Sequence, residues 1–75
     1  MTESQKVKLS VRQTECLELI AAGATSGEIA AALRLSVRTV DHYIGDACAK
    51  LGVRSRAQAV ALAISLNMVP PPTPR

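Results

Sequence analysis

Apolar residues recur at helical spacing in four segments of the chain, and polar residues fill the positions between them. The spacing predicts helices over residues 11–22, 26–33, 37–51 and 56–68. No segment alternates apolar and polar residues over the length of a strand. We therefore expect an all-α fold, a four-helix bundle.

The boundaries of these helices are marked by residues that typically cap helices. Three predicted helices begin with Ser or Thr followed three residues later by Gln or Glu, the capping-box pattern. The pairs are Ser10 with Gln13, Thr25 with Glu28, and Ser55 with Gln58. Ser36 is expected to cap the third helix, and glycines are expected to end the first and third helices at Gly23 and Gly52.

Each predicted helix has one apolar face that we expect to be buried. In the third helix this face comprises Val40, Ile44, Ala47 and Leu51. The corresponding residues of the other helices are Cys16, Leu17 and Ile20, then Ile29, Ala30 and Leu33, then Ala59, Val60, Ala63 and Leu66.

The chain has 75 residues, enough for one domain, which we place at residues 9–69. Residues 1–8 are polar and residues 70–75 are rich in proline, so both are expected to be tails. Apolar residues make up 48% of the chain, a composition typical of folded proteins. The chain has one Tyr and neither Phe nor Trp, which disfavours aromatic stacking on single-stranded nucleic acid.

Cys16 and Cys48 fall within the apolar helical patterns, and their spacing suits neither a disulfide scaffold nor a zinc site. We expect both to be small core residues in a reducing compartment, with no metal and no cofactor. The first eight residues are polar and charged, and no apolar run approaches the roughly 20 residues that span a bilayer. These features favour a cytoplasmic protein without a membrane partner.

Only two or three residues separate the second predicted helix from the third, an arrangement typical of a helix-turn-helix over residues 26–51. The face of the third helix opposite its apolar stripe carries Arg38, His42, Gly45, Asp46 and Ala49. Glycine inside a helix costs about 0.5–1 kcal/mol relative to alanine. Close approach of Gly45 to a DNA groove would explain this glycine, and so would a tolerant exposed position.

Nine basic and six acidic residues give a net charge of +3, which permits a polyanionic partner without requiring one. Basic residues gather at the two ends of the third helix: Arg34 and Arg38 at its start, and Lys50, Arg54 and Arg56 around and after its end. Such a distribution suits the two phosphate strands that border a groove. A solvated basic surface is the alternative interpretation.

About four-fifths of the chain, from Leu9 to Val69, resembles the LuxR-type (GerE-like) helix-turn-helix domain. The stretch from Ser36 to Arg56 is the most specific part of the resemblance. The matching residues are Leu9-Ser10, Arg12, Glu15, Cys16-Leu17, Gly23, Glu28-Ile29-Ala30, Leu33, Ser36, Arg38-Thr39-Val40, Lys50-Leu51-Gly52-Val53, Ser55-Arg56 and Ala59-Val60.

The resemblance implies that the third helix enters the major groove of double-stranded DNA. The base-contacting positions of the family fall at Asp41, His42 and Gly45, and we add Arg38 from the same exposed helix. The expected phosphate contacts are Thr39, Tyr43, Lys50, Arg54 and Arg56. Asp41 departs from the Lys, Arg or Asn often found at its position. A carboxylate there can accept a hydrogen bond from cytosine but repels phosphates.

The segment from Thr39 to Tyr43 and the alanine-rich ending look more like quorum-sensing members of the family than like response regulators. In such proteins an N-terminal domain binds an acyl-homoserine lactone, which these 75 residues could not hold. The resemblance also implies a homodimer on a two-fold DNA site, with RNA polymerase as a further partner. The fourth helix has a second small apolar surface, Ala57, Ala61 and Leu62, which we assign to dimerisation that is weak without DNA or a regulatory domain. Alanine chosen only for helix propensity is the alternative.

A second class of function is a protein-interaction module that keeps the fold, binds DNA weakly and pairs with a partner regulator through the fourth helix. A sigma-factor-like promoter-binding domain ranks lower because it lacks the Lys50-Leu51-Gly52-Val53 ending. An enzyme is least favoured, since the chain has a single His and no glycine-rich phosphate loop.

Overall fold

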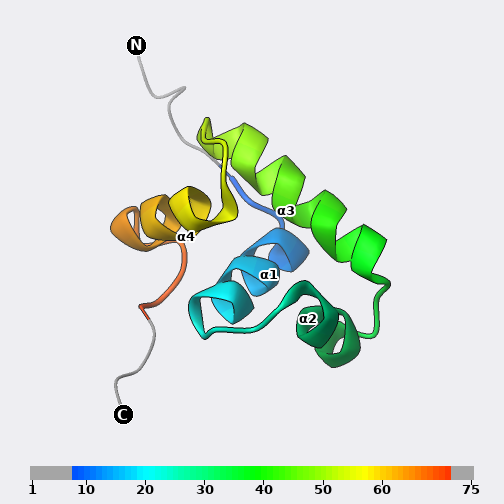
Figure 1. Ribbon diagram of the computed structural model, residues 1–75. Coiled ribbons are helices and arrows are strands. Elements are labelled where there is room, and N and C mark those ends of the chain that lie inside the picture. Colours follow the sequence, from blue (N-terminus) through cyan, green and yellow to red (C-terminus); the bar gives the residue numbers. More distant parts are fainter. Residues whose placement is uncertain (1–7, 72–75) are drawn as a thin grey trace.

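The computed structural model describes residues 8–71, which form four α-helices and no strand (Figure 1). The helices are α1 (Val11–Ala21), α2 (Ser26–Leu33), α3 (Val37–Leu51) and α4 (Arg56–Ser65). Both α1 and α3 pack against all three other helices, whereas α2 and α4 lie toward opposite ends of α3 and meet through the side chains of Arg56 and Ser26. The all-α prediction is confirmed.

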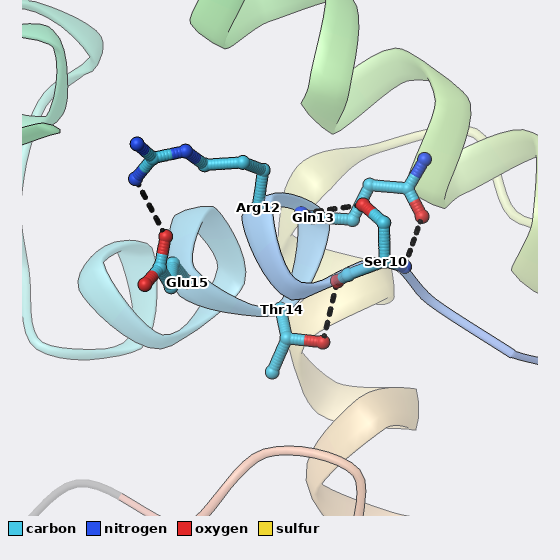
Figure 2. Close-up of polar contacts among 5 residues, drawn as sticks. All are labelled: Ser10, Arg12, Gln13, Thr14 and Glu15. Atoms are coloured by element: carbon cyan, nitrogen blue, oxygen red, sulfur yellow. Dashed lines mark hydrogen bonds and ion pairs between the residues drawn. The ribbon is translucent and has the colours of Figure 1, made fainter.

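The predicted helix starts are all present. Figure 2 shows the first capping box, in which Ser10 Oγ accepts a hydrogen bond from the Gln13 amide at 3.1 Å. In return, Gln13 Oε1 accepts from the Ser10 amide at 2.9 Å. The boxes of α2 and α4 are also complete, and Ser36 caps α3 through the Thr39 amide at 3.0 Å.

Each helix is followed by a residue in the left-handed conformation. Gly23 and Gly52 fill this position after α1 and α3, as predicted, with φ of 98° and 73°. Arg34 and Asn67 fill it after α2 and α4, with φ of 61° and 62°. The Asn67 turn ends α4 at Ser65, three residues before the predicted end, because the Met68 amide turns back to donate to the Ala63 carbonyl at 2.8 Å.

The core consists of two clusters joined through α3. All four α3 residues predicted to be buried are buried. Leu66 was expected in the core but is 50% exposed, because α4 ends before it. Val69 fills the core instead, at 1% exposure, after the chain has turned back beneath α4.

Most of the other predicted core residues are fully buried, and the remainder pack at the edges of the clusters. The fully buried ones are Cys16, Leu17, Ile29, Ala59 and Ala63, and Ala30 is buried at 6% exposure; Ile20, Leu33 and Val60 are partly buried. Both cysteines are free thiols, with Cys16 buried and Cys48 half-buried. Burial raises the pKa of the Cys16 thiol, the nearby Glu15 carboxylate raises it further, and Arg12 opposes both.

The expected tails fall mostly outside the described residues, which include only Lys8, Pro70 and Pro71 of them, none of which is helical. Among residues 8–71, no helix is both long and apolar enough to cross a membrane. The same part of the chain contains no group of His, Cys, Asp and Glu arranged to hold a metal ion.

Candidate nucleic-acid interface

A three-residue connection sets the angle between α2 and α3. Arg34 takes the left-handed conformation, and the next amide, that of Leu35, donates to the Ala30 carbonyl at 2.9 Å. The Leu35 side chain packs against the core cluster shared by α1, α2 and α3, and Ser36 then caps α3. Helices α2 and α3 therefore form the predicted helix-turn-helix.

The predicted outer face of α3 is exposed along its whole length. Its residues are Arg38, His42, Gly45, Asp46 and Ala49. A Cβ atom added at Gly45 would meet no atom within 4 Å, so the centre of this face is open and low. His42 Nε2 and Asp46 Oδ2 lie 3.5 Å apart on successive turns, with side chains 74% and 50% exposed. This face could lie in a groove without rearrangement of the helix.

Asp41 and Arg56, which we expected to contact DNA separately, are paired in the structure. Arg56 Nη2 donates to Asp41 Oδ1 at 3.3 Å, and both side chains are about half exposed. Ser26 completes the cluster, because its hydroxyl donates to Asp41 Oδ1 at 2.9 Å and accepts from Arg56 Nη1 at 2.8 Å. The cluster links the first residues of α2 and α4 to the N-terminal half of α3.

Lys50 is also engaged within the protein. Its Nζ donates to Gln13 Oε1 at 3.0 Å and to the Lys8 carbonyl at 3.2 Å. It therefore joins the last turn of α3 to the start of α1. A phosphate contact by Lys50 would have to compete with these two acceptors.

The other three basic residues of the predicted interface are exposed. Arg34 and Arg38 lie at the start of α3, and Arg54 lies between α3 and α4. Within residues 8–71 none of these three guanidinium groups makes a hydrogen bond or ion pair. They are the cations that a phosphate could bind without displacing a partner.

Thr39 and Tyr43, the two remaining predicted phosphate contacts, are partly buried. Thr39 Oγ1 accepts a hydrogen bond from Ser36 Oγ at 2.9 Å beside the N-terminus of α3. Tyr43 packs against the core cluster under α2 and α3. The structure thus gives Tyr43 a packing role, and its phosphate contact stays a prediction.

The predicted dimerisation residues are divided between surface and core. Ala57 and Ala61 are exposed on α4, whereas Leu62 is partly buried and packs against the core. Leu66 is exposed near the end of the same helix. The apolar surface of α4 is therefore small.

Sequence reasoning missed Ser26 and the contact between Gln13 and Lys50. Ser26 is 15 residues from Asp41 and 30 from Arg56, and Gln13 is 37 residues from Lys50. No local spacing indicates contacts at such separations. The sequence indicates only that Ser26 and Gln13 lie in the first turns of their helices.

The chain resembles known bacterial regulators over most of its length. Residues 7–63 match the family described as bacterial regulatory proteins, luxR family. The chain is 40% identical to the transcriptional activator protein AhyR of Aeromonas hydrophila over 63 residues, 84% of this chain and 24% of the relative. It is 41% identical to the quorum-sensing-dependent transcriptional regulator VjbR of Brucella abortus over 64 residues, 85% of this chain and 25% of the relative. The chain thus spans about a quarter of the length of these curated relatives.

Solved structures show the same fold. The transcription factor GerE superposes with a TM-score of 0.79 at 30% identity, covering 81% of this chain and 91% of GerE. The VqmA dimer of Vibrio cholerae, described as a LuxR-type receptor, gives a TM-score of 0.78 at 29% identity, covering 88% of this chain and 30% of VqmA. With its helix-turn-helix, its exposed third helix and these similarities, the chain belongs to the LuxR family of bacterial regulatory proteins, as its helix-turn-helix domain.

Proposed function

We propose that this domain binds a specific double-stranded DNA sequence by placing the outer face of α3 in the major groove. The observation that carries the proposal is the open centre of that face at Gly45, with the exposed Arg34 and Arg38 at one end and Arg54 beyond the other. A helix with low bulk at its centre can approach base edges closely. Cations at both ends suit the phosphates on either side of the groove.

Base contacts are assigned to the outer face of α3 and phosphate contacts to its ends. Arg38 and His42 have donors that can reach base edges, and Gly45 allows the backbone to approach. Arg34 and Arg54 are the strongest candidates for phosphate contacts, because neither guanidinium has a partner in the described part of the chain. Thr39 and Tyr43 remain candidates beside them.

We further propose that the domain acts as a homodimer on a two-fold site, with α4 of each copy facing the other. The exposed Ala57, Ala61 and Leu66 support a small contact that DNA or another domain would strengthen. The domain would then be the DNA-binding part of a longer, quorum-sensing-type regulator that acts on RNA polymerase in the cytoplasm. The quorum-sensing description of VjbR supports the quorum-sensing part of this proposal.

Selection of bound duplexes from a randomised pool tests the function directly. We expect the wild-type domain to enrich a two-fold symmetric motif whose half-site spacing reports the dimer geometry. Arg38→Ala should reduce that enrichment. Arg12→Ala removes the same charge from α1, where Arg12 pairs with Glu15 at 2.8 Å, and should leave the motif unchanged. Failure of the wild type to enrich any motif would contradict the proposal.

The alternative function is a partner-binding module that uses α4 and binds DNA weakly. The pairing of Asp41 with Arg56 favours this alternative, because it removes one cation from the predicted DNA surface. The salt dependence of duplex binding separates the two functions. The two arginines assigned to phosphates, Arg34 and Arg54, predict a log–log slope of roughly −2 per domain, whereas a flat dependence would favour the partner-binding module.

A further inference from the structure

One oxygen of Asp41 is the point at which two donors from two other helices converge. Ser26 Oγ lies 2.9 Å from Asp41 Oδ1, and Arg56 Nη2 lies 3.3 Å from the same oxygen. Arg56 Nη1 also donates to Ser26 Oγ at 2.8 Å, which orients the hydroxyl hydrogen toward the carboxylate. The three side chains therefore form a closed set of hydrogen bonds around one anionic oxygen.

The donors of this cluster are those that commonly bind a phosphate oxygen. A guanidinium and a hydroxyl are frequent donors to DNA phosphates, and arginine favours anions that can accept two hydrogen bonds. The Arg56 and Asp41 side chains are 44% and 51% exposed, so an anion from solvent can reach the guanidinium. The cluster also lies at one edge of α3, beside the face that is proposed to enter the groove.

We propose that Ser26 and Arg56 form a binding site for one phosphate of the DNA backbone, and that Asp41 occupies this site in the unbound domain. Asp41 is then an internal competitor of DNA, which lowers affinity for every sequence alike, and it is not a base-contacting residue. The inference rests on the proposed function, because the competing ligand is the backbone of a bound duplex. Ser26, which sequence reasoning passed over, becomes a phosphate contact.

The ion pair between Arg56 and Asp41 is weak enough for a DNA phosphate to displace Asp41. Ion pairs between exposed side chains shift an equilibrium by roughly fivefold at most. A backbone phosphate held nearby by other contacts offers the same two donors an equivalent anionic oxygen. Asp41 would then turn toward solvent when DNA binds, because half of its side chain is already exposed.

The test compares Asp41→Asn with Asp46→Asn, which removes the same charge from the same helix but breaks only the contact with His42. Affinities for the selected duplex and for an unrelated duplex are measured over a range of salt concentrations. We expect Asp41→Asn to tighten binding to both duplexes by roughly two- to fivefold, with an unchanged preferred motif and a salt slope steeper by up to about one. Asp46→Asn should give a smaller gain.

The same measurements in Ser26→Ala and Arg56→Gln backgrounds isolate the site. If the Asp41→Asn gain arises from release of this site, it should largely disappear when Arg56 is replaced and shrink when Ser26 is replaced. Thermal melting followed by circular dichroism shows whether each variant is folded, and only folded variants enter the comparison.

Three results would overturn the inference. A loss of affinity or a changed base preference in Asp41→Asn would make Asp41 a base-contacting residue. If Asp41→Asn raised affinity only as much as Asp46→Asn does, and did so equally in the Arg56→Gln background, the effect of Asp41 would be general repulsion of DNA. If the wild type and all variants bind no duplex at any salt concentration, the proposed function fails and this inference fails with it, an outcome distinct from the first two because in those the wild type binds.

Discussion

The ammonium group of Lys50 and the side-chain oxygen of Gln13 lie 3.0 Å apart and join the last turn of α3 to the first turn of α1. The same Gln13 oxygen accepts the Ser10 amide, so one acceptor serves both the cap of α1 and the contact with α3 (Figure 2). Gln13 is also the one polar residue among residues 8–71 that is buried, at 6% exposure. The cap of α1 is thereby part of the packing between helices.

Replacement of Gln13 should therefore cost more than replacement of an ordinary capping residue. We expect Gln13→Ala to lower the free energy of unfolding by about 2 kcal/mol, because the Ser10 amide and Lys50 both lose an acceptor. Gln58→Ala is the matched control, since Gln58 holds the same position in the capping box of α4, where its oxygen accepts the exposed Ser55 and Arg54 amides and, within residues 8–71, no donor of another helix. It should cost about 0.5–1 kcal/mol. Urea denaturation measures both, and equal losses would show that the Lys50 contact adds nothing.

Val69 should be as important for stability as a residue within a helix. It is 1% exposed and packs in the cluster that includes Leu17 and Ala63. We expect Val69→Ala to lower the free energy of unfolding by about 1.5–3 kcal/mol through the lost burial and the cavity left behind. Val11→Ala, at a position 74% exposed, should change it by less than about 0.5 kcal/mol. Equal melting temperatures for the two variants would mean that the segment after α4 does not stabilise the domain.

The helices were predictable because each is specified within a few residues. Capping pairs lie three residues apart and the apolar stripe of α3 repeats every three or four residues, so the interactions that determine these helices are between residues close in sequence. The end of α4 was predicted wrongly because it depends on a left-handed Asn67, which a helical pattern continuing to Met68 conceals. The burial of Val69 follows from that turn and shares the same cause.

Two turns within residues 8–71 use a residue other than glycine in the left-handed conformation, and glycine should stabilise both. Such a conformation costs a residue with a side chain about 1–2 kcal/mol, less for asparagine than for arginine. After the greater flexibility of glycine in the unfolded chain is subtracted, we expect Arg34→Gly to raise the free energy of unfolding by about 0.5–1 kcal/mol and Asn67→Gly by less. Chemical denaturation measures both variants.

The same pair of variants separates stability from DNA binding. Arg34→Gly removes an exposed cation beside α3, so we expect a more stable domain that binds duplexes more weakly and with a shallower salt dependence. Asn67→Gly should leave binding unchanged. Unaltered binding by Arg34→Gly would remove this residue from the proposed interface.

The burial of the Cys16 thiol predicts slow modification by thiol reagents and a free energy of unfolding that falls at alkaline pH. Because burial raises the pKa of Cys16 in the folded state, the unfolded chain loses this proton first as pH rises above about 9, and the stabilising contribution declines from there. We expect Cys48, which is only half-buried, to react with a thiol reagent well before Cys16. Cys48→Ala should retain the alkaline loss of stability, and Cys16→Ala should lack this component. Faster modification of Cys16 would contradict its burial.

The candidate site was less predictable than the fold. Position along α3 correctly indicated which residues are exposed, since exposure follows the helical period. It did not indicate that Asp41 and Arg56 pair with each other, because that contact depends on how α4 returns toward α2. A count of basic residues along a sequence therefore overstates the number of cations available to DNA wherever an acidic residue of another helix pairs with a basic residue.

Gly45 offers the sharpest test of how closely α3 approaches DNA. Nothing within the described part of the domain requires a glycine there, because a Cβ would meet no atom within 4 Å and the helix is regular around it. Gly45→Ala should therefore raise the free energy of unfolding by about 0.5–1 kcal/mol. If the backbone at this position lies against base edges, the same methyl group should weaken binding to the selected duplex, so that stability and affinity change in opposite directions. Ala49→Gly, one turn further along the same face, should destabilise the domain by a similar amount without adding bulk. A Gly45→Ala domain that is more stable and binds the selected duplex as tightly as the wild type would show that the glycine is merely tolerated, and that the closest approach to DNA lies nearer the start of α3, at Arg38 and His42.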